Sequence, residues 1–175
     1  MSENMNMAVM ASQSDLRRVF SVFPTGVVAV CAMVEGRPVG FAVNSFNSVS
    51  LKPPLVSICV ARTSTTWPLL AQAPRLGLSV LGAQHGGLCR KLASRSADRF
   101  KDEAWTVSND GAVLIDGAAL WLECSMSANF TAGDHDIVVF DVREAQLFDA
   151  VKPLVFHHSQ FRELMNEECV PTQCA

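Results

Sequence analysis

The sequence is poor in charge and contains no long apolar run. Charged residues make up 18% of its 175 residues and apolar residues 49%, and the formal net charge is −3. Nucleic-acid binding requires clustered lysine and arginine, whereas the basic residues here are scattered, apart from a modest group over 90–101. No segment approaches the roughly 20 apolar residues of a membrane-spanning helix, and the N-terminus lacks a secretory signal pattern. We therefore expect a folded, cytoplasmic protein that binds neither nucleic acid nor membrane.

Several motifs of catalysis and metal binding are also missing. The four histidines have no H-x-x-x-H spacing and the six cysteines no C-x-x-C pair, so no metal site is predicted. The absence of G-x-G-x-x-G and G-x-x-x-x-G-K-[ST] argues against a Rossmann or P-loop site, and the absence of G-x-S-x-G against a hydrolase. Cys31, Cys59 and Cys124 lie in apolar surroundings and are interpreted as core residues, whereas Cys169 and Cys174 fall in a polar tail.

Short apolar runs separated by turns predict one β-rich domain with a few short helices. We expect a leader over 1–13, the domain over 14–165 and a tail over 166–175. Helical spacing predicts a first helix with Ser14 as its N-cap, and the last segment, "PLVFHHSQFREL", is interpreted as a strand followed by a short helix. Strands are expected over 27–34, 39–46, 55–61 and 75–82, and strands alternating with turns over 112–149. The pattern is typical of a barrel, although periodicity alone does not separate a barrel from a sandwich.

The run "AVNSFNSVS" concentrates amide and hydroxyl side chains between two predicted strands. Its apolar side chains are separated by polar pairs rather than alternating strictly, which predicts a bend or bulge. Backbone amides and the Asn and Ser side chains of such a segment would suit the edge of a heteroaromatic ring. A solvated loop rich in turn-forming residues is an equal alternative.

A second hydroxyl cluster, "ARTSTTWP", precedes a predicted short helix. Free backbone N–H groups at a helix start favour a phosphate, and Arg62 would add positive charge. Ordinary N-capping is the alternative, but it requires only one of Thr63, Ser64 and Thr65. The cluster therefore favours a phosphate site.

Histidines occur at two further places. His135 stands between two aspartates in "GDHD", at the start of a strand, where an imidazole can orient a substrate. His157 and His158 lie in "FHHSQF". A surface turn with a solvated imidazole is the more common structure for such a group.

Taken together, these segments resemble the flavin reductase family, the short FMN-binding split-barrel reductases of two-component monooxygenases. The resemblance runs from about residue 15 to about residue 162. It rests on the order and spacing of "FPTGVVAV", "PVGFAVNSFNSVSLKPPLVSICVA", "ARTSTTWPLL", "DRF" with the following Trp105, "IDGAALWLECSM", "GDHDIVVF" and "PLVFHHSQF".

The resemblance implies a six-stranded antiparallel split β-barrel that forms a homodimer, with the flavin near the dimer interface. A mean hydropathy of +0.22 also favours a buried oligomer interface. The segment 42–49 would line the isoalloxazine ring, the segment 61–65 would follow the ribityl chain to the phosphate, and Lys91 and Arg95 would approach the phosphate or an adenylate. The cofactor-binding residues implied are Ala42, Val43, Asn44, Ser45, Phe46, Ser48, Val49, Cys59, Ala61, Arg62, Thr63, Ser64, Thr65, Ser79, Lys91, Arg95, Phe156, His157 and His158.

The same resemblance implies an NAD(P)H:flavin oxidoreductase that transfers hydride to FMN or FAD and supplies reduced flavin to a separate monooxygenase. His135 would position NADH or NADPH, together with the segment 156–158, and no side chain would serve as acid or base. Val43, Ser79 and His158 depart from residues common in the family, and they bear mainly on nicotinamide recognition. Two alternatives stay open: a flavin-binding carrier or sensor without turnover, and a flavin-dependent reductase of another small molecule.

Overall fold

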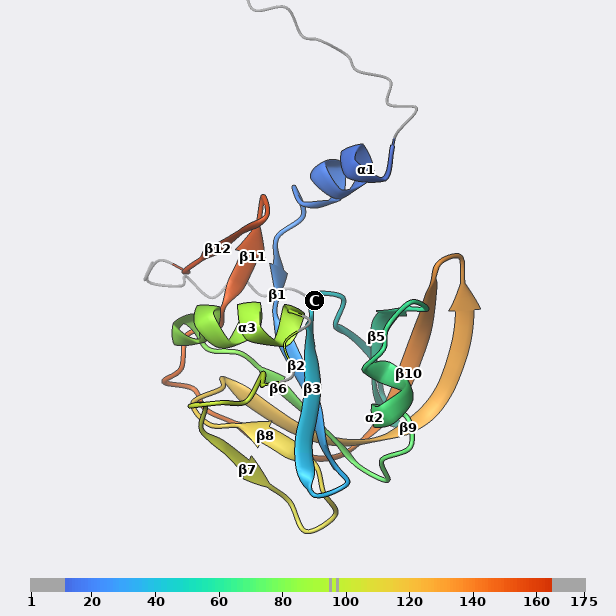
Figure 1. Cartoon of the computed structure of the whole chain (residues 1–175), viewed down its shortest axis with the longest axis vertical. Coiled ribbons are helices and arrows are strands. Elements are labelled where there is room, and N and C mark those ends of the chain that lie inside the picture. Colours follow the sequence, from blue (N-terminus) through green and yellow to red (C-terminus); the bar gives the residue numbers. More distant parts are fainter. Residues whose placement is uncertain (1–11, 95, 97, 165–175) are drawn as a thin grey trace, which may run out of the picture.

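A curled, antiparallel sheet of seven strands forms the body of the protein, in a computed structural model that describes residues 12–94, 96 and 98–164 (Figure 1). The strand order is β3-β2-β6-β9-β10-β5-β4. The mainly β class with short helices is confirmed, but the six-stranded barrel is wrong, because seven strands pair and β3 and β4 are the two ends of the order. The additional strand comes from the polar run: its second half pairs with β5 although most of its side chains are exposed.

The strands of this sheet are β2 Val28–Val34, β3 Arg37–Val43, β4 Asn47–Leu51, β5 Pro54–Ala61, β6 Leu76–Val80, β9 Leu120–Ala132 and β10 His135–Leu147. The shorter strands are β1 Thr25–Gly26, β7 Trp105–Val107, β8 Val113–Ile115, β11 Val155–His157 and β12 Gln160–Arg162. The helices are α1 Gln13–Phe20, α2 Trp67–Leu70, η1 Ala83–His85 and α3 Gly86–Ala93. No helix in the described part of the chain is long and apolar enough to cross a bilayer.

The β2–β3 hairpin follows directly from the local sequence. Glu35 and Gly36 both have positive φ angles, 49° and 78°, which is the backbone of the turn type that matches the twist of paired strands. The two strands expected on either side of "EGRP" are therefore joined by a tight hairpin turn. The bend predicted in the polar run is confirmed as well, since β3 ends at Val43, β4 begins at Asn47, and the β4–β5 register shifts between Ser48 and Ser50.

Two apolar clusters pack against the two faces of β2. Val28 and Val30 point into the cluster enclosed by the curled sheet and α2, whereas Ala29 and Cys31 point into a cluster covered by α3. Because both faces of β2 are buried, its sequence is a continuous apolar run and does not alternate between apolar and polar residues. The predicted burial of Cys31 and Cys124 is confirmed, while Cys59 is only half-buried; burial raises the pKa of Cys124 to about 12.

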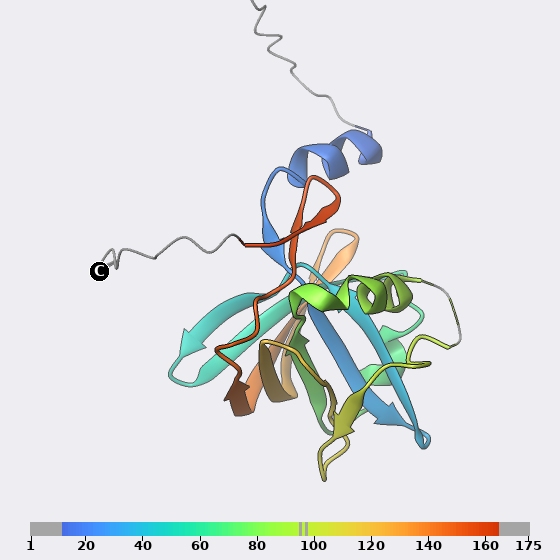
Figure 2. The ribbon, with the colours of Figure 1, turned by 90° about the vertical axis from the view of Figure 1, so that its left-hand side faces the viewer.

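Both ends of the described chain differ from the sequence-based expectation. The first helix begins at Gln13, and its cap is Ser12, whose Oγ accepts a hydrogen bond from the Asp15 N–H at 3.3 Å. Ser14 therefore lies inside the first turn and is not the N-cap. The last segment is a hairpin, β11–β12, and not a strand and helix, because it pairs with itself and with β1. Figure 2 shows this hairpin beside β1, with α1 standing away from the sheet.

Candidate functional site

The free edge of β3 is the feature around which the site is built. In the described chain β3 pairs with β2 alone, and it runs between α3 on one side and α2 on the other (Figure 1). Pro38 has no N–H to present at this edge, and the Gly40 carbonyl accepts a hydrogen bond from Arg99 rather than from β2. Because an antiparallel strand alternates between its two edges, the N–H and C=O of Ala42 also point to the free edge.

Three hollows adjoin one another along this edge, and we call them together the β3 groove. The largest, about 550 Å³, lies between the hydroxyl cluster before α2 and the end of α3. It shares Ala42 and Ala93 with a hollow of about 260 Å³, which in turn shares Asn44 with a hollow of about 490 Å³. The residues that line the β3 groove are Phe23–Val28, Phe41–Asn47, Thr63–Thr66, Val80, Cys89, Arg90, Leu92–Ser94, Arg99, Phe156 and Phe161.

The polar run contributes its backbone and some of its side chains to the groove. Ala42, Val43, Asn44 and Phe46 all line it, as the sequence predicts. The side chains of Ser48 and Val49, in contrast, are exposed on β4 and lie outside the lining of these three hollows.

Ser45 has a structural partner. Its Oγ accepts a hydrogen bond from the Cys59 N–H at 2.8 Å and donates one to the Cys59 carbonyl at 3.1 Å. The side chain thereby continues the β4–β5 ladder beyond Asn47, whose register partner is Ser57. Cys59 takes part through these backbone groups, which fix the bend between β3 and β4 at the groove.

Replacing Ser45 by alanine is expected to lower the free energy of unfolding by about 1–2 kcal/mol, because two backbone groups of Cys59 lose their partner. Urea denaturation measures this. The matched control is Ser48→Ala, which removes the same hydroxyl from an exposed position and should change stability by about 0.5 kcal/mol or less. Equal effects of the two substitutions would contradict the bridging role of Ser45.

In the hydroxyl cluster, some side chains bond to the backbone and others are exposed in the groove. Ser64 Oγ accepts a hydrogen bond from the Trp67 N–H at 3.1 Å and so satisfies the first N–H of α2, although the N-cap residue is Thr66, whose side chain forms no cap bond. Thr63 and Thr65 line the groove with exposed side chains. Arg62 is exposed and its N–H donates to the Asp134 carbonyl at 3.0 Å, next to Ala61 at the end of β5.

Arg99 contributes more to the site than its sequence pattern indicates. Its Nη1 donates to the Gly40 carbonyl at 2.8 Å and to Thr66 Oγ1 at 2.9 Å, which ties the edge of β3 to the hydroxyl cluster. Its Nε is buried without a partner among the described residues, as is Thr25 Oγ1 elsewhere in the groove. Buried polar atoms normally have a hydrogen-bond partner, so both atoms are polar groups that the described residues leave unsatisfied. The only sequence signal for Arg99 is the "DRF" motif.

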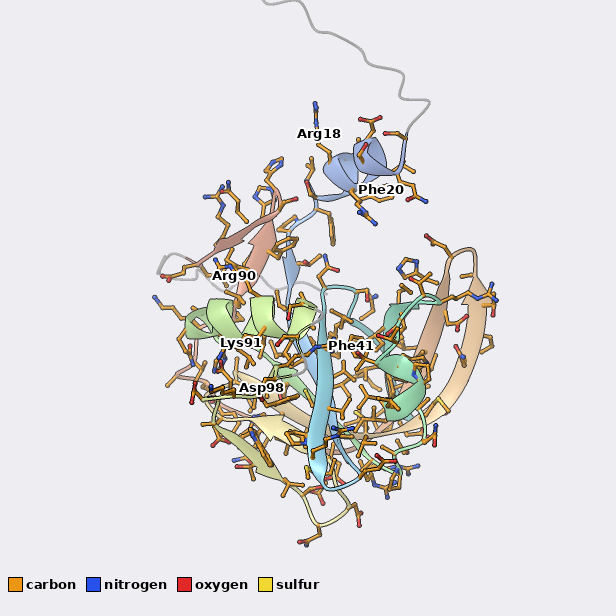
Figure 3. The ribbon with its side chains drawn as sticks, viewed as in Figure 1. Arg18, Phe20, Phe41, Arg90, Lys91 and Asp98 are labelled. Atoms are coloured by element: carbon orange, nitrogen blue, oxygen red, sulfur yellow. The ribbon has the colours of Figure 1, made fainter. Side chains whose placement is uncertain are left out.

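The structure places the other basic and polar candidates as follows. Lys91 Nζ lies 2.6 Å from Glu103 Oε1 and donates to the Lys101 carbonyl at 2.8 Å; Figure 3 shows it on the side of α3 opposite Arg90. Ser79 is fully buried and accepts from the Ile115 N–H at 3.0 Å, so it has no surface to offer a ligand. Arg95 lies outside the described residues.

The histidines lie on two different elements. His135 begins β10 in register with Ala61, and its Nδ1 lies 2.7 Å from Asp134 Oδ1. This hydrogen bond holds the pKa of the Asp134 carboxyl below its usual value. His157 and His158 lie at the end of β11, with ring centroids 4.2 Å apart, next to Phe156. Figure 1 shows the β11–β12 hairpin and the β9–β10 turn well apart, so one chain does not bring His135 to the other two.

Comparison with known proteins agrees with this geometry. The model of the flavin reductase like domain matches residues 20–165. A flavin reductase of Pseudomonas putida is 39% identical over 146 residues, covering 83% of this chain and 86% of the relative. The reductase subunit of a flavin-dependent monooxygenase from Rhodococcus jostii is 32% identical over 167 residues, covering 94% and 86%.

A solved structure is similar over nearly the whole chain. The NADH:FAD oxidoreductase of Streptomyces globisporus C-1027, in complex with NAD and FAD fragments, superposes with a TM-score of 0.84 at 36% identity, covering 93% of this chain and 100% of the other. With a family model that spans most of the described residues and relatives of this identity, the chain belongs to the flavin reductase-like family of enzymes.

Proposed function

We propose that this enzyme oxidises NADH or NADPH, transfers the hydride to a flavin held in the β3 groove, and releases reduced flavin to a separate monooxygenase. The observation that carries the proposal is the groove itself, which runs along a free strand edge and ends at an arginine with an unpartnered Nε. The relatives named as flavin reductases and monooxygenase reductase subunits support the same reaction.

The groove fits the ring system of a flavin. Such a ring has an apolar face and an edge of alternating hydrogen-bond donors and acceptors. Ala42 offers both backbone groups from the free edge of β3, and Val43, Phe156 and Phe161 offer apolar surface in the adjoining hollow. A volume of about 550 Å³ in the largest hollow is within the usual range of small-molecule sites, roughly 300–1,000 Å³.

The other end of the groove fits a phosphate. The hydroxyls of Thr63 and Thr65 donate from one side. Arg99 lines the same hollow and provides a positive charge, and charge-assisted hydrogen bonds to a phosphate are the stronger ones. A phosphate role for Arg62, Lys91 and Arg95 stays a prediction.

The chemistry of hydride acceptance is supplied by the flavin when it is bound. The residues of the chain hold and orient: the edge of β3 fixes the plane of the ring, and the hydroxyl cluster with Arg99 fixes the phosphate. No side chain of the groove is required to donate or remove a proton during transfer. Substitutions in the groove are therefore expected to affect binding and geometry more than they abolish the reaction.

His135 is proposed to position the reduced nicotinamide. Its hydrogen bond with Asp134 holds the ring at the entrance of β10, and its side chain is 43% exposed. His135→Ala is expected to raise the KM for NADH about tenfold, which corresponds to the loss of one hydrogen bond to the nicotinamide cofactor. The Kd for the flavin should not change. Steady-state kinetics and a flavin titration measure the two quantities. An unchanged KM would remove His135 from the nicotinamide site.

A homodimer is proposed because α1 has no buried residue and its apolar side chains face solvent in the single chain. Phe20 is 69% exposed and Phe23 is 74% exposed, and Figure 3 shows Phe20 on α1, away from the sheet. Exposed apolar surface of this kind marks contact sites. Light scattering during gel filtration should give twice the 18.9 kDa chain mass; a mass of one chain contradicts the dimer.

A cytoplasmic location remains proposed, in keeping with four described cysteines that are all free thiols.

The decisive experiment follows absorbance at 340 nm with purified protein, NADH or NADPH, and FMN or FAD. Loss of absorbance that depends on the flavin is the expected result and identifies the preferred pair. Flavin binding without consumption of either nucleotide would overturn the reductase and leave the carrier without turnover. A second protein that oxygenates its substrate only when this enzyme, NADH and flavin are present would identify the monooxygenase.

A further inference from the structure

The end of the β3 groove that fits the flavin ring has a positive charge of its own. We call it the ring end, and the end at Arg99 the phosphate end. The hollow of about 260 Å³ at the ring end is lined by Arg90 of α3 and by Phe156 and Phe161 of the β11–β12 hairpin. Figure 3 shows Arg90 on the side of α3 toward this hairpin. Among the described residues that line the hollow, Arg90 is the only one with a charge.

The position of Arg90 is fixed by packing and not by a counter-ion. Its Cζ lies 5.1 Å from the centroid of the Phe161 ring, within the range of a cation–π interaction. Phe161 also packs on Gly86, one turn earlier on the same face of α3, where an added Cβ would lie 3.3 Å from its Cδ2. In the described part of the chain no carboxylate forms an ion pair with Arg90, whereas the neighbouring Lys91 is paired with Glu103. The Arg90 charge is thus held in place without being neutralised.

The polar half of a flavin ring is the part that fits beside Arg90. This half carries the alternating hydrogen-bond donors and acceptors, which suit the backbone groups of Ala42 at the free edge of β3. Ala42 and Asn44 line the same hollow as Arg90. The assignment rests on the proposed function, since it assumes that the flavin occupies the β3 groove.

Hydride transfer adds negative charge to this half of the ring. A hydride carries two electrons and one proton from C4 of the reduced nicotinamide to N5 of the flavin. The nicotinamide ring becomes a cation, and the reduced flavin becomes an anion whose charge is shared by N1 and the C2 carbonyl oxygen. A fixed positive charge beside these atoms stabilises the product more than the reactant. Arginine is effectively always protonated, so Arg90 acts through its charge and not as a proton donor.

We propose that Arg90 makes the β3 groove bind reduced flavin more tightly than oxidised flavin. The charge at the ring end then favours hydride transfer toward the flavin, and the reduced product is retained in preference to the oxidised form. Arg99 has a different effect, because it lines the hollow at the phosphate end and the phosphate is the same in both oxidation states.

The test consists of two titrations with FMN. Oxidised FMN is titrated in air and followed by its fluorescence, and dithionite-reduced FMN is titrated under anaerobic conditions by calorimetry. Four proteins are compared: the unaltered chain, Arg90→Gln, Arg90→Lys and Arg143→Gln. Arg143→Gln is the matched control, because it removes the same charge from an exposed position on β10, outside the lining of the groove. Circular dichroism checks that all four fold alike.

We expect the unaltered chain to bind reduced FMN about tenfold more tightly than oxidised FMN, the effect of one charge–charge contact that is partly exposed to water. This ratio corresponds to a rise of about 30 mV in the two-electron potential of the bound flavin. Arg90→Gln should raise the Kd for reduced FMN about tenfold and leave the Kd for oxidised FMN within about twofold. Arg90→Lys should retain a preference for reduced FMN, because it keeps the charge, and Arg143→Gln should change neither Kd.

The pH dependence separates charge from packing. In acid solution N1 of the reduced flavin is protonated and the ring is neutral, so the preference of the unaltered chain for reduced FMN should disappear. A preference that is the same in acid and in alkaline solution overturns the proposal. Equal losses of both forms in Arg90→Gln also overturn it and leave Arg90 as a support for Phe161. A change confined to the KM for NADH, measured at 340 nm with FMN as acceptor, overturns it as well and assigns the charge to the nicotinamide cofactor.

Failure of the proposed function gives a different result. If the unaltered chain binds FMN in neither oxidation state, the groove is not a flavin site and both proposals fall together. If it binds FMN and oxidises NADH, but binds the two oxidation states equally, only the role of Arg90 fails.

Discussion

Replacing Arg99 by alanine is expected to raise the Kd for both FMN and FAD by about 30-fold, equivalent to about 2 kcal/mol. The substitution removes the Nη1 group that bridges the Gly40 carbonyl and Thr66 Oγ1, and it removes the charge at the phosphate end. Thr66 is buried, so its hydroxyl loses a partner where water does not readily replace it. Fluorescence titration with each flavin measures the effect.

The conservative substitution separates charge from geometry. Arg99→Lys keeps the positive charge, but a single ammonium cannot reproduce the fork of the guanidinium, so about a third of the lost binding free energy should return. Urea denaturation of both variants shows how much of the loss comes from folding. If Arg99→Ala binds FMN as the unaltered chain does, the phosphate end of the groove lies elsewhere.

Replacing Phe140 by alanine is expected to lower the free energy of unfolding by about 3–5 kcal/mol. Phe140 is fully buried and packs edge-on against Trp67 with ring centroids 6.3 Å apart. Trp67 in turn packs edge-on against Phe41 of β3 at 6.4 Å. This aromatic series joins β10 to the first residue of α2, directly after the hydroxyl cluster, and then to the strand that carries the groove.

Urea denaturation compares Phe140→Ala with Leu147→Ala, a truncation on the same strand at a side chain that is 67% exposed. The control should cost about 0.5 kcal/mol or less. Because Trp67 supports both walls of the groove, Phe140→Ala should also weaken flavin binding in protein that remains folded. Comparable losses at the two positions would show that Phe140 is not a core residue.

The regular elements were predictable because their signals are local. The β2–β3 turn follows from Gly36, and the burial of β2 on both faces follows from its unbroken apolar run. The strand β4 was not predictable in this way. Val49 and Leu51 alternate with serines over only four residues, and every side chain but that of Ser50 is exposed, so no buried face marks the segment as a strand although it pairs with β5 in a short hairpin.

The site was predictable as a region, but the tasks of its side chains were not. Polar composition indicates both the bend after β3 and the loop before α2, and both line the groove. Composition does not reveal that Ser45 and Ser64 satisfy backbone groups. Nor does it reveal that Lys91 is paired with Glu103.

Arg99 shows the limit most clearly. Its partners are the carbonyl of Gly40, 59 residues earlier, and the hydroxyl of Thr66, 33 residues earlier. No periodicity or spacing rule joins residues so far apart, because their approach depends on the finished sheet. Only the short "DRF" motif, through the family resemblance, indicates that the position matters.

The free edge of β3 has a consequence for association between proteins. An exposed edge is a template to which a strand of another chain can add, which leads to aggregation. On β3, Pro38 interrupts the row of donors and the Gly40 carbonyl is already bound by Arg99. An incoming strand would find few of the successive partners that it requires. The same two residues therefore keep the edge accessible to a small ligand while they protect it against strand addition.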